Sequence, residues 1–263
     1  MSYERIQLTV EEGIATLTLN QPKTMNAMSV PLQQEVRAAL TELKQRSDVR
    51  ALILTGVGKA FCSGADLGSM DPSSDGPSLG TQVATLMEDI SNPLALELRA
   101  MPFPVVSAVN GAAAGAGASI ALSGDIVIAG ESAYFLFPFI PKLGIIPDLG
   151  ATWVLPRLIG RARAMAACLL GDRIMAKDAV DQGLIWKAVA DDQLQAEAIA
   201  VAKRLASGPA HAAPEIRAAL DRAEEATLEE QLAYEAERQK DLIDRPTFQE
   251  GVNAFLEKRA PKF

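Results

Sequence analysis

The chain has 263 residues, 49% of them apolar, which is enough to bury one large hydrophobic core. Its net charge of −8 excludes a general polyanion-binding surface such as a nucleic-acid face. Two cysteines, Cys62 and Cys168, and an N-terminal segment without signal-peptide features lead us to expect a cytoplasmic protein without a disulfide.

The first predicted elements are a hairpin, a helix and a strand. β-branched residues alternate with others in 6–10 and 14–20, on both sides of a Glu-Glu-Gly turn, as in a β-hairpin. Apolar residues recur at helical spacing in 30–46. The short apolar run 50–56 ends in glycine and indicates a strand that is buried on both faces.

A less regular segment follows this strand. We expect a loop at 57–70 and, at 71–80, a stretch dominated by turn-forming residues. A helical pattern then covers 86–101, and Pro93 is expected to bend or interrupt that helix, because proline lacks the N–H that a helix interior needs.

The same order of elements then recurs. Residues 103–111 predict a buried strand, 112–124 a helix of small residues, and 125–130 another strand. Polar residues and glycines interrupt the apolar stretch 103–129, so buried strands and a helix explain it better than a membrane span does. The unit of strand, glycine-rich turn and helix has therefore been used twice.

Beyond about residue 190 the sequence becomes densely charged. Helical periodicity appears in 191–206, 211–226 and 228–244, with no obvious core belonging to these helices alone. We therefore divide the chain into a core, 1–190, and a helical C-terminal subdomain, 191–263. Such a tail packs on the main domain or on a neighbouring subunit.

Two glycine-rich loops, 60–67 and 110–119, each follow a buried strand. Where side chains are lacking, backbone N–H groups can approach a ligand closely, and the second loop leads into a helix N-terminus. Together the two loops can bracket one oxygen atom. The alternative is that Gly115 and Gly117 only permit tight helix packing.

Three other kinds of site fit these residues less well. A dinucleotide fold needs G-x-G-x-x-G, whereas the spacing from Gly111 is G-x-x-x-G-x-G. A serine hydrolase needs G-x-S-x-G, which does not occur, and the single histidine, His211, falls in the tail, far in sequence from Ser63 and Ser119. No His/Cys or carboxylate cluster has ligand spacing, so we expect no metal.

Asp148 is a single acid in the apolar, glycine-bearing stretch 143–153. Four large apolar residues are close to it in sequence: Ile145, Ile146, Leu149 and Trp153. Such a setting raises a carboxyl pKa by desolvation and strengthens the carboxylate as a base. The alternative is that Asp148 only caps a helix predicted at 149–160.

Several motifs together resemble the crotonase (enoyl-CoA hydratase/isomerase) family. They are "AFCSGADL", "PVVSAVNGAAAGAGASIALSGDIVIAG" and "GIIPDLGATWVLPRLIGRARAMAACLLG". The third motif, with "GLIWKAV" and "EGVNAFLEKRAPKF", is most similar to the phenylacetate-pathway isomerase branch of the family. The resemblance covers nearly the whole chain.

This resemblance implies an α/β fold, a crotonase-like spiral of repeated ββα units, with a C-terminal helical region that builds a homotrimer or a hexamer of two trimers. It implies an acyl-CoA thioester as substrate and no cofactor other than the coenzyme A that the substrate carries. The N–H groups of Ala65 and Ala116 are then expected to form an oxyanion hole, which stabilises an enolate more than the neutral thioester.

The resemblance also marks two departures from the hydratases. Those enzymes carry two glutamates, and their positions here are Ser119 and either Phe139 or Ile140. Both carboxylates are missing, which argues against ordinary water addition, because a paired acid and base activates the water. Asp148 instead matches the aspartate of the isomerase and dehalogenase branches, and we expect it to move a proton between two carbons.

The resemblance further implies contacts with coenzyme A, most of them through backbone groups. These candidates lie along the adenosine segment and beside the oxyanion hole: Lys23, Thr24, Met25, Ser63, Asp66, Leu67, Gly115 and Gly117. Phe255 and Lys258 match positions that reach the nucleotide from a neighbouring subunit and would supply positive charge for its phosphates. For each lysine the alternative is a solvated surface charge. Cys62 is expected in the core.

We therefore expect an acyl-CoA isomerase, acting on 1,2-epoxyphenylacetyl-CoA or on a 3-enoyl thioester whose double bond moves to the 2,3 position. The shared step is proton relocation on a thioester enolate. Two alternatives stay open: an enoyl-CoA hydratase that uses Asp148 with an unrecognised second group, and a non-catalytic acyl-CoA binding protein. Solvent deuterium exchange into the acyl chain separates an enzyme from a binder.

Overall fold

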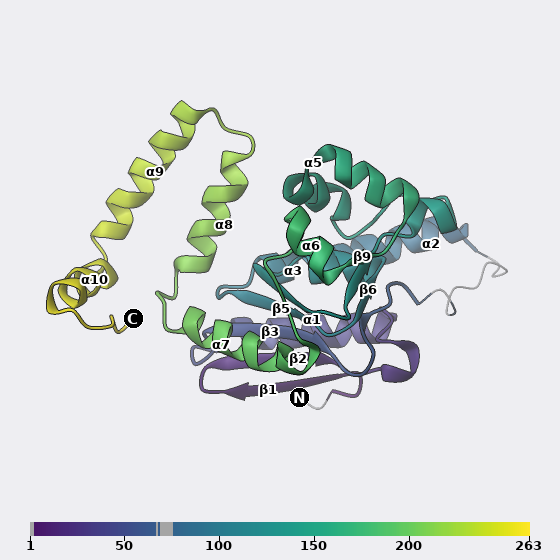
Figure 1. Cartoon of the computed structure of the whole chain (residues 1–263), viewed down its shortest axis with the longest axis horizontal. Coiled ribbons are helices and arrows are strands. Elements are labelled where there is room, and N and C mark those ends of the chain that lie inside the picture. Colours follow the sequence, from purple (N-terminus) through teal and green to yellow (C-terminus); the bar gives the residue numbers. More distant parts are fainter. Residues whose placement is uncertain (1–2, 67, 69–75) are drawn as a thin grey trace.

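Six strands form the larger sheet of the computed structural model, which describes residues 3–66, 68 and 76–263 (Figure 1). The first two strands are antiparallel, and all later neighbours are parallel. In sheet order they are β1 (Ile6–Glu11), β2 (Ile14–Leu19), β3 (Ala51–Gly56), β5 (Val105–Val109), β7 (Ile126–Gly130) and β10 (Lys187–Val189). The predicted hairpin and the strands predicted at 50–56, 103–111 and 125–130 are confirmed.

A smaller sheet holds four short strands. In sheet order they are β4 (Ala60–Cys62), β6 (Ala112–Ala114), β8 (Tyr134–Leu136) and β9 (Ile174–Met175). The prediction of a loop over 57–70 is wrong at β4, and the helix predicted from residue 112 begins only at residue 116. Strands of three residues show no alternation, and β4 exists because Ala60 pairs with Ala112, far along the chain.

The chain repeats one structural unit. Each unit gives a strand to the larger sheet, then a strand to the smaller sheet, and then one or more helices. The helices of this part are α1 (Val30–Lys44), α2 (Leu79–Leu86), α3 (Asn92–Arg99), α4 (Ala116–Ala121), α5 (Ala151–Leu170) and α6 (Ala176–Gln182). Thus β3 and β4 precede α2 and α3, β5 and β6 precede α4, and β7 and β8 precede α5. The expected spiral of ββα units is confirmed.

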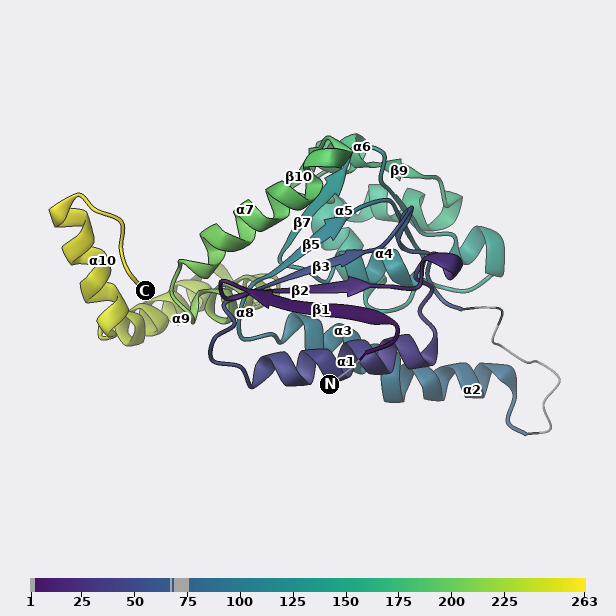
Figure 2. The same cartoon turned by 90° about the horizontal axis from the view of Figure 1, so that it is seen from below.

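Helices cover both faces of the larger sheet, as Figure 2 shows for α1 and for α7 (Leu194–Ala206). In β3, Leu52 and Leu54 belong to the core that contains the buried residues of α1 and α3. Ala51 and Ile53, which point to the other face, pack with residues of α7. The expectation that this strand is buried on both faces is confirmed, and truncating a leucine at such a position typically costs about 2–5 kcal/mol.

The helix predicted over 86–101 is interrupted, as Pro93 led us to expect. A π-helical turn, Met87–Ser91, joins α2 to α3, and the N–H of Asn92 donates to the carbonyl of Met87. Pro93 lies in the first turn of α3, where its missing N–H costs no hydrogen bond. The wider turn therefore separates α2 from α3 and accommodates the proline.

Three more helices follow α7, namely α8 (Ala212–Ala223), α9 (Leu228–Ile243) and α10 (Pro246–Glu257). They extend away from the sheets, whereas α7 lies against the larger sheet (Figure 1). The division of the chain at residue 190 stays a prediction. No helix in the described part of the chain is long and apolar enough to cross a membrane.

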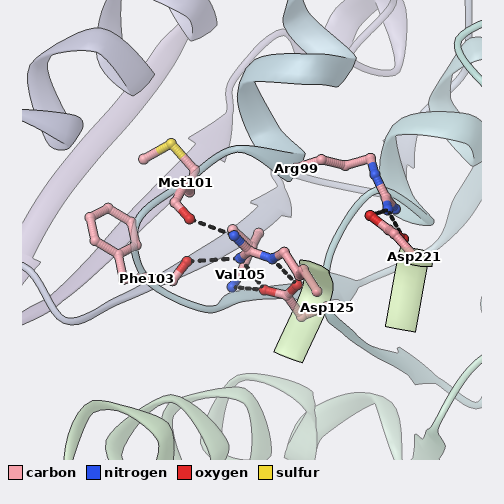
Figure 3. Close-up of polar contacts among 7 residues, drawn as sticks. Arg99, Met101, Phe103, Val105, Asp125 and Asp221 are labelled. Atoms are coloured by element: carbon pink, nitrogen blue, oxygen red, sulfur yellow. Dashed lines mark hydrogen bonds and ion pairs between the residues drawn. The ribbon is translucent and has the colours of Figure 1, made fainter. Parts of the chain in front are cut away.

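One half-buried arginine, Arg217, attaches α8 to the core, and Figure 3 labels the residues that it contacts. Arg217 of α8 forms a two-point ion pair with Asp125, which also accepts the N–H of Val105 at the start of β5. The same guanidinium donates to the backbone carbonyls of Met101 and Phe103. Every nitrogen of the guanidinium and both carboxylate oxygens take part in these bonds, which hold α8 against the start of β5.

Two further ion pairs tie the end of α8 to the core. Asp221 pairs with Arg99 at 2.9 Å, and Glu224 pairs with Arg157. Both guanidinium groups lie over the ring of Trp153, at 4.7 and 3.9 Å from its centre. Because α8 buries only Ala213 among its residues, charged contacts carry most of its attachment within one chain.

Candidate functional site

The two glycine-rich loops meet at Gly64. Its φ of +96° is one that residues with a side chain rarely adopt. A Cβ at this position would lie 2.7 Å from the carbonyl oxygen of Ala114 and 3.4 Å from the nitrogen of Ala116. The lack of a side chain at Gly64 therefore allows the backbone of the first loop to touch the start of α4.

The two predicted N–H donors lie on either side of this contact. Ala65 follows Gly64, whose carbonyl accepts the N–H of Met28 at 2.8 Å and so holds the loop in an isolated bridge. Ala116 is the first residue of α4, so its N–H has no acceptor within the helix. The helix dipole adds positive potential at that end. The arrangement can accept one oxygen that carries developing negative charge.

The two glycines on either side of Ala116, Gly115 and Gly117, are needed for different structural reasons. Gly115 precedes α4 with a φ of +54°, whereas a Cβ on Gly117 would lie only 2.2 Å from the carbonyl oxygen of Cys62. Gly117 thus permits the tight packing of α4 against β4 that the sequence left open as an alternative. This packing also brings the two loops together, so the tight helix packing is itself the reason why the two loops are close. A direct contact of either glycine with a ligand stays a prediction.

Asp148 lies in the turn before α5 and does not cap that helix. The N-cap is Gly150, in a left-handed conformation, with no side-chain hydrogen bond to the helix. The carboxylate oxygen Oδ1 of Asp148 is buried and has no hydrogen-bond partner among the described residues. The capping hypothesis is therefore wrong.

The backbone of Asp148, in contrast, is held at two points. Its carbonyl accepts the hydroxyl of Ser119 at 3.0 Å and the N–H of Ala151 at 3.0 Å. Ser119 belongs to α4, the helix whose first N–H is the second predicted donor. The hydroxyl of Ser119 thus attaches the turn that carries Asp148 to the helix that begins with Ala116.

Burial raises the pKa of the Asp148 carboxyl from its ordinary value of 3.8 to about 6, and a hydrogen bond from its own backbone opposes this shift. The predicted direction of the shift is confirmed. The expected cause is partly wrong, because Ile145 and Ile146 are exposed, Ile146 by 71%, while Leu149 is buried. Of these expected neighbours, Leu149 is therefore buried next to the acid, and the two isoleucines are not.

The predicted coenzyme A segments also come together. The hydroxyl of Ser63 donates to the carbonyl of Thr24, and the N–H of Ser63 donates to the carbonyl of Met25, at 3.1 and 3.0 Å. Lys23, Thr24 and Met25 are exposed beside the first glycine loop, and Asp66 is half-buried. Leu67 lies outside the described residues.

Phe255 and Lys258 lie elsewhere in the chain. They are at the end of α10, which Figure 1 places well away from the glycine loops. Phe255 is 81% exposed. Its remaining neighbours belong to the tail, where it lines a hollow of about 440 Å³ with Phe248 and Leu256. A single chain does not bring these two residues to the site.

The positions associated with the hydratase glutamates hold residues without acid or base function. Ser119 is buried. Phe139 is also buried, and its ring atom Cζ lies 3.7 Å from the point where a Cβ on Gly115 would stand. An aromatic ring thus lies close to the residue that precedes α4.

Other chemistries find little support in the described residues. Burial raises the pKa of Cys62 to about 12, so this thiol stays protonated, and its predicted place in the core is confirmed. The hydroxyl of Ser63 already donates to a backbone carbonyl. Residues 3–66, 68 and 76–263 contain no group of three His, Cys, Asp or Glu side chains placed to hold a metal ion.

The sequence did not single out Asn26, which organises the first loop. Asn26 is fully buried and adopts a φ of +57°. Its side-chain nitrogen donates to the carbonyls of Val57 and Ala60, and its side-chain oxygen accepts the N–H of Gln21. A polar residue between apolar ones in "MNAM" is the signal that points to such a role.

A second pair of buried polar residues supports the first donor. Gln33 donates to the carbonyl of Met28 at 2.9 Å and accepts the hydroxyl of Ser91 at 2.7 Å. Met28 in turn bridges to Ala65. The chain of contacts links the first donor to α1 and to the start of α3.

Comparisons with known proteins bear on this geometry. The family described as enoyl-CoA hydratase/isomerase matches residues 9–263. The chain is 44% identical to a probable enoyl-CoA hydratase of Rhodobacter capsulatus, over 100% of this chain and 99% of that protein. It is also 44% identical to the 1,2-epoxyphenylacetyl-CoA isomerase of Escherichia coli, over 97% of this chain and 96% of that protein.

Solved structures agree with the sequence comparisons. An enoyl-CoA hydratase from Bacillus anthracis superimposes with a TM-score of 0.90 at 32% identity, covering 99% of each chain. Because relatives named hydratase and isomerase are equally similar in sequence, these likenesses establish the fold and the family but do not distinguish the two reactions.

Proposed function

The chain belongs to the enoyl-CoA hydratase/isomerase family, and we propose that within it the protein is an acyl-CoA isomerase that relocates one proton by means of Asp148. The single observation that carries this proposal is the buried carboxylate oxygen of Asp148, which has no hydrogen-bond partner among the described residues. A base held in this way, with its pKa raised to about 6, is suited to take and return a proton near neutral pH.

The first part of the mechanism is binding of the thioester carbonyl. Its oxygen accepts hydrogen bonds from the N–H groups of Ala65 and Ala116. When a proton leaves the adjacent carbon, negative charge moves onto this oxygen, and the two donors are already oriented to receive it. One such donor typically stabilises the transition state by about 3–4 kcal/mol.

The second part is the proton transfer. The Asp148 carboxylate removes a proton from C2 of a 3-enoyl thioester. The electron pair of that C–H bond forms a dienolate, whose negative charge is shared between the thioester oxygen, through C1, and C4, through C3. The neutral Asp148 carboxyl then returns a proton to C4, which leaves the double bond between C2 and C3. Asp148 ends in its starting form, so one group suffices and no co-reactant is consumed.

Two substrates fit this chemistry. A 3-enoyl-CoA uses the steps as written. The second substrate is 1,2-epoxyphenylacetyl-CoA, which the likeness to the Escherichia coli enzyme supports. That enzyme is named as an isomerase of this thioester, whose carbonyl group could bind to the same two N–H donors. We propose that no cofactor is needed beyond the coenzyme A of the substrate, and activity is expected to survive exhaustive dialysis against a chelator.

A hydratase is the second candidate, because one relative at 44% identity is named a probable enoyl-CoA hydratase. Water addition needs a group that activates water and another that protonates the other carbon. Ser119 and Phe139 supply neither, which favours the isomerase. The remaining alternative is a protein that binds acyl-CoA esters without converting them.

Mass spectrometry of the products in deuterium oxide separates the three. An isomerase converts 3-enoyl-CoA to 2-enoyl-CoA without adding water, and solvent deuterium enters the acyl chain whenever the Asp148 carboxyl exchanges its proton with solvent before returning one to C4. Asp148→Asn should abolish both changes while the variant still binds the thioester. A hydrated product from 2-enoyl-CoA without isomer formation would establish the hydratase, and an unchanged, bound thioester would establish the binder.

We further propose that the protein assembles as a trimer or as a hexamer of two trimers, in which Phe255 and Lys258 reach the nucleotide bound by a neighbouring chain. The supporting observation is that α8–α10 extend from the core and leave large apolar side chains exposed, among them Phe255 and Leu256. Sedimentation gives the assembly state. Lys258→Ala is expected to raise the KM for acyl-CoA with little change in kcat.

A further inference from the structure

Ser119 lies between the two parts of the proposed machinery. It is 2% exposed and belongs to α4. Its hydroxyl is 3.0 Å from the backbone carbonyl oxygen of Asp148 and 3.4 Å from that of Gly115, one turn back in its own helix. A serine inside a helix commonly bonds to the carbonyl four residues earlier, so the shorter bond to Asp148 is a departure from the usual local contact.

The place of Ser119 on α4 gives this bond a geometric consequence. Ala116 and Ser119 are three residues apart, which corresponds to about 4.5 Å along a helix axis. The same short helix therefore presents the N–H of Ala116 and, less than one turn later, holds the backbone of Asp148. The separation between the oxyanion donor and the acid is set by one rigid element.

Asp148 depends on such a contact because, among the described residues, the one hydrogen bond to its carboxyl comes from its own backbone. The oxygen Oδ1 is buried without a hydrogen-bond partner in the described part of the chain. A carboxylate held by hydrogen bonds would lose basicity, since those bonds favour its charged form. The acid can thus be kept basic and still be placed accurately only if its backbone is fixed.

We propose that Ser119 is a positioning residue, whose hydroxyl fixes the backbone carbonyl of Asp148 relative to the N–H of Ala116. This inference rests on the proposed function of Asp148. A purely structural role would require only that the buried hydroxyl find some acceptor, and the carbonyl of Gly115 could provide it.

Ser123 offers a matched control, since it is also buried and lies in the turn directly after α4, four residues beyond Ser119. Its hydroxyl donates to the carbonyl of Ser119 at 3.0 Å, which is the ordinary contact within a helix. Ser123→Ala and Ser119→Ala each remove one buried hydroxyl from this segment, but only Ser119→Ala removes a bond to the turn that carries Asp148.

The test compares steady-state isomerisation by the wild type, Ser119→Ala, Ser119→Thr and Ser123→Ala. We expect Ser119→Ala to lower kcat by about tenfold or more with KM unchanged, because a small misplacement of a catalytic group is costly. Ser119→Thr keeps the hydroxyl and should recover much of the loss, and Ser123→Ala should behave as the wild type. The low-pH limb of kcat should also move to lower pH in Ser119→Ala, because a looser turn admits water to the carboxyl.

Equal kcat values for Ser119→Ala and Ser123→Ala, or a loss confined to KM, would overturn the inference. If Ser119→Ala does not fold, Ser119→Cys serves in its place, since it keeps the size of the side chain and weakens the donor. A different result, isomerisation that persists in Asp148→Asn, would contradict the proposed function itself. If Asp148→Asn is inactive and Ser119→Ala is fully active, only the positioning role is wrong.

Discussion

Asp148 and Asp125 are two aspartates that the fold treats in opposite ways. Asp125 sits with its side chain 24% exposed against Arg217, which is 14% exposed, and both of its oxygens have donors. Asp148 has a buried oxygen with no donor in the part of the chain that the structure describes. The paired acid attaches the tail to the core. The unpaired acid keeps a high proton affinity, which the proposed removal of a carbon-bound hydrogen requires.

The largest effect is expected from removing the unpaired acid. Asp148→Asn should lower kcat for isomerisation by about 10³-fold, since the amide cannot accept a proton from carbon. The comparison predicts that this loss comes without unfolding. Circular dichroism of the variant should match the wild type, and a fall in activity that merely follows loss of structure would contradict the assignment.

Removing the partner of the paired acid should act on structure instead. Arg217→Met leaves the Asp125 carboxylate and the carbonyls of Met101 and Phe103 without this donor. The expected cost is about 3 kcal/mol, at the low end for buried pairs because this pair is partly exposed. Amide hydrogen exchange should quicken in α8 and stay slow in the larger sheet. Arg46→Met, which breaks an exposed pair with Asp48, is the matched control.

The pH dependence of stability should sharpen the comparison. The pKa of Asp148 is 3.8 in its ordinary state and about 6 in the folded protein, so between these values the folded state binds more protons than the unfolded state. Stability therefore falls as pH rises through this window, by about 3 kcal/mol at most. Denaturation midpoints of Asp148→Asn should lack this fall. Parallel pH profiles for the two proteins would mean that the carboxyl is not desolvated.

The smallest effect is expected where a charged pair is wholly solvated. Lys177 and Asp181 lie four residues apart on α6, with side chains 82% and 59% exposed. Water and salt screen such a pair, so Lys177→Ala should leave Tm and kcat unchanged within error. A clear fall in Tm would show that even a solvent-exposed ion pair contributes measurably to the stability of this protein.

Local sequence patterns predicted those parts of the fold that a few neighbouring residues determine. The period of the apolar residues in α1 and the apolar run of β3 are examples. The strand β4 was missed because it is defined by its pairing with β6, which no local pattern contains. The start of α4 was placed too early for the same reason.

The candidate site shows the same limit. The glycine motifs located Gly64 and Gly115, since only a residue without a side chain adopts their backbone conformations easily. The bond between Ser119 and Asp148 joins positions 29 residues apart and could not be read from either motif. For the same reason Ile145 and Ile146, which are neighbours of Asp148 only in sequence, were wrongly expected to bury it.

The central claim, that a single desolvated acid carries the proton, is tested most directly by the pH dependence of kcat for deuterium incorporation into the acyl chain. We expect deuterium incorporation to fall as pH decreases, with a midpoint near the Asp148 pKa of about 6. We expect Asp148→Asn to show no incorporation at any pH. A midpoint near 4, or a profile that survives intact in Asp148→Asn, would contradict this claim.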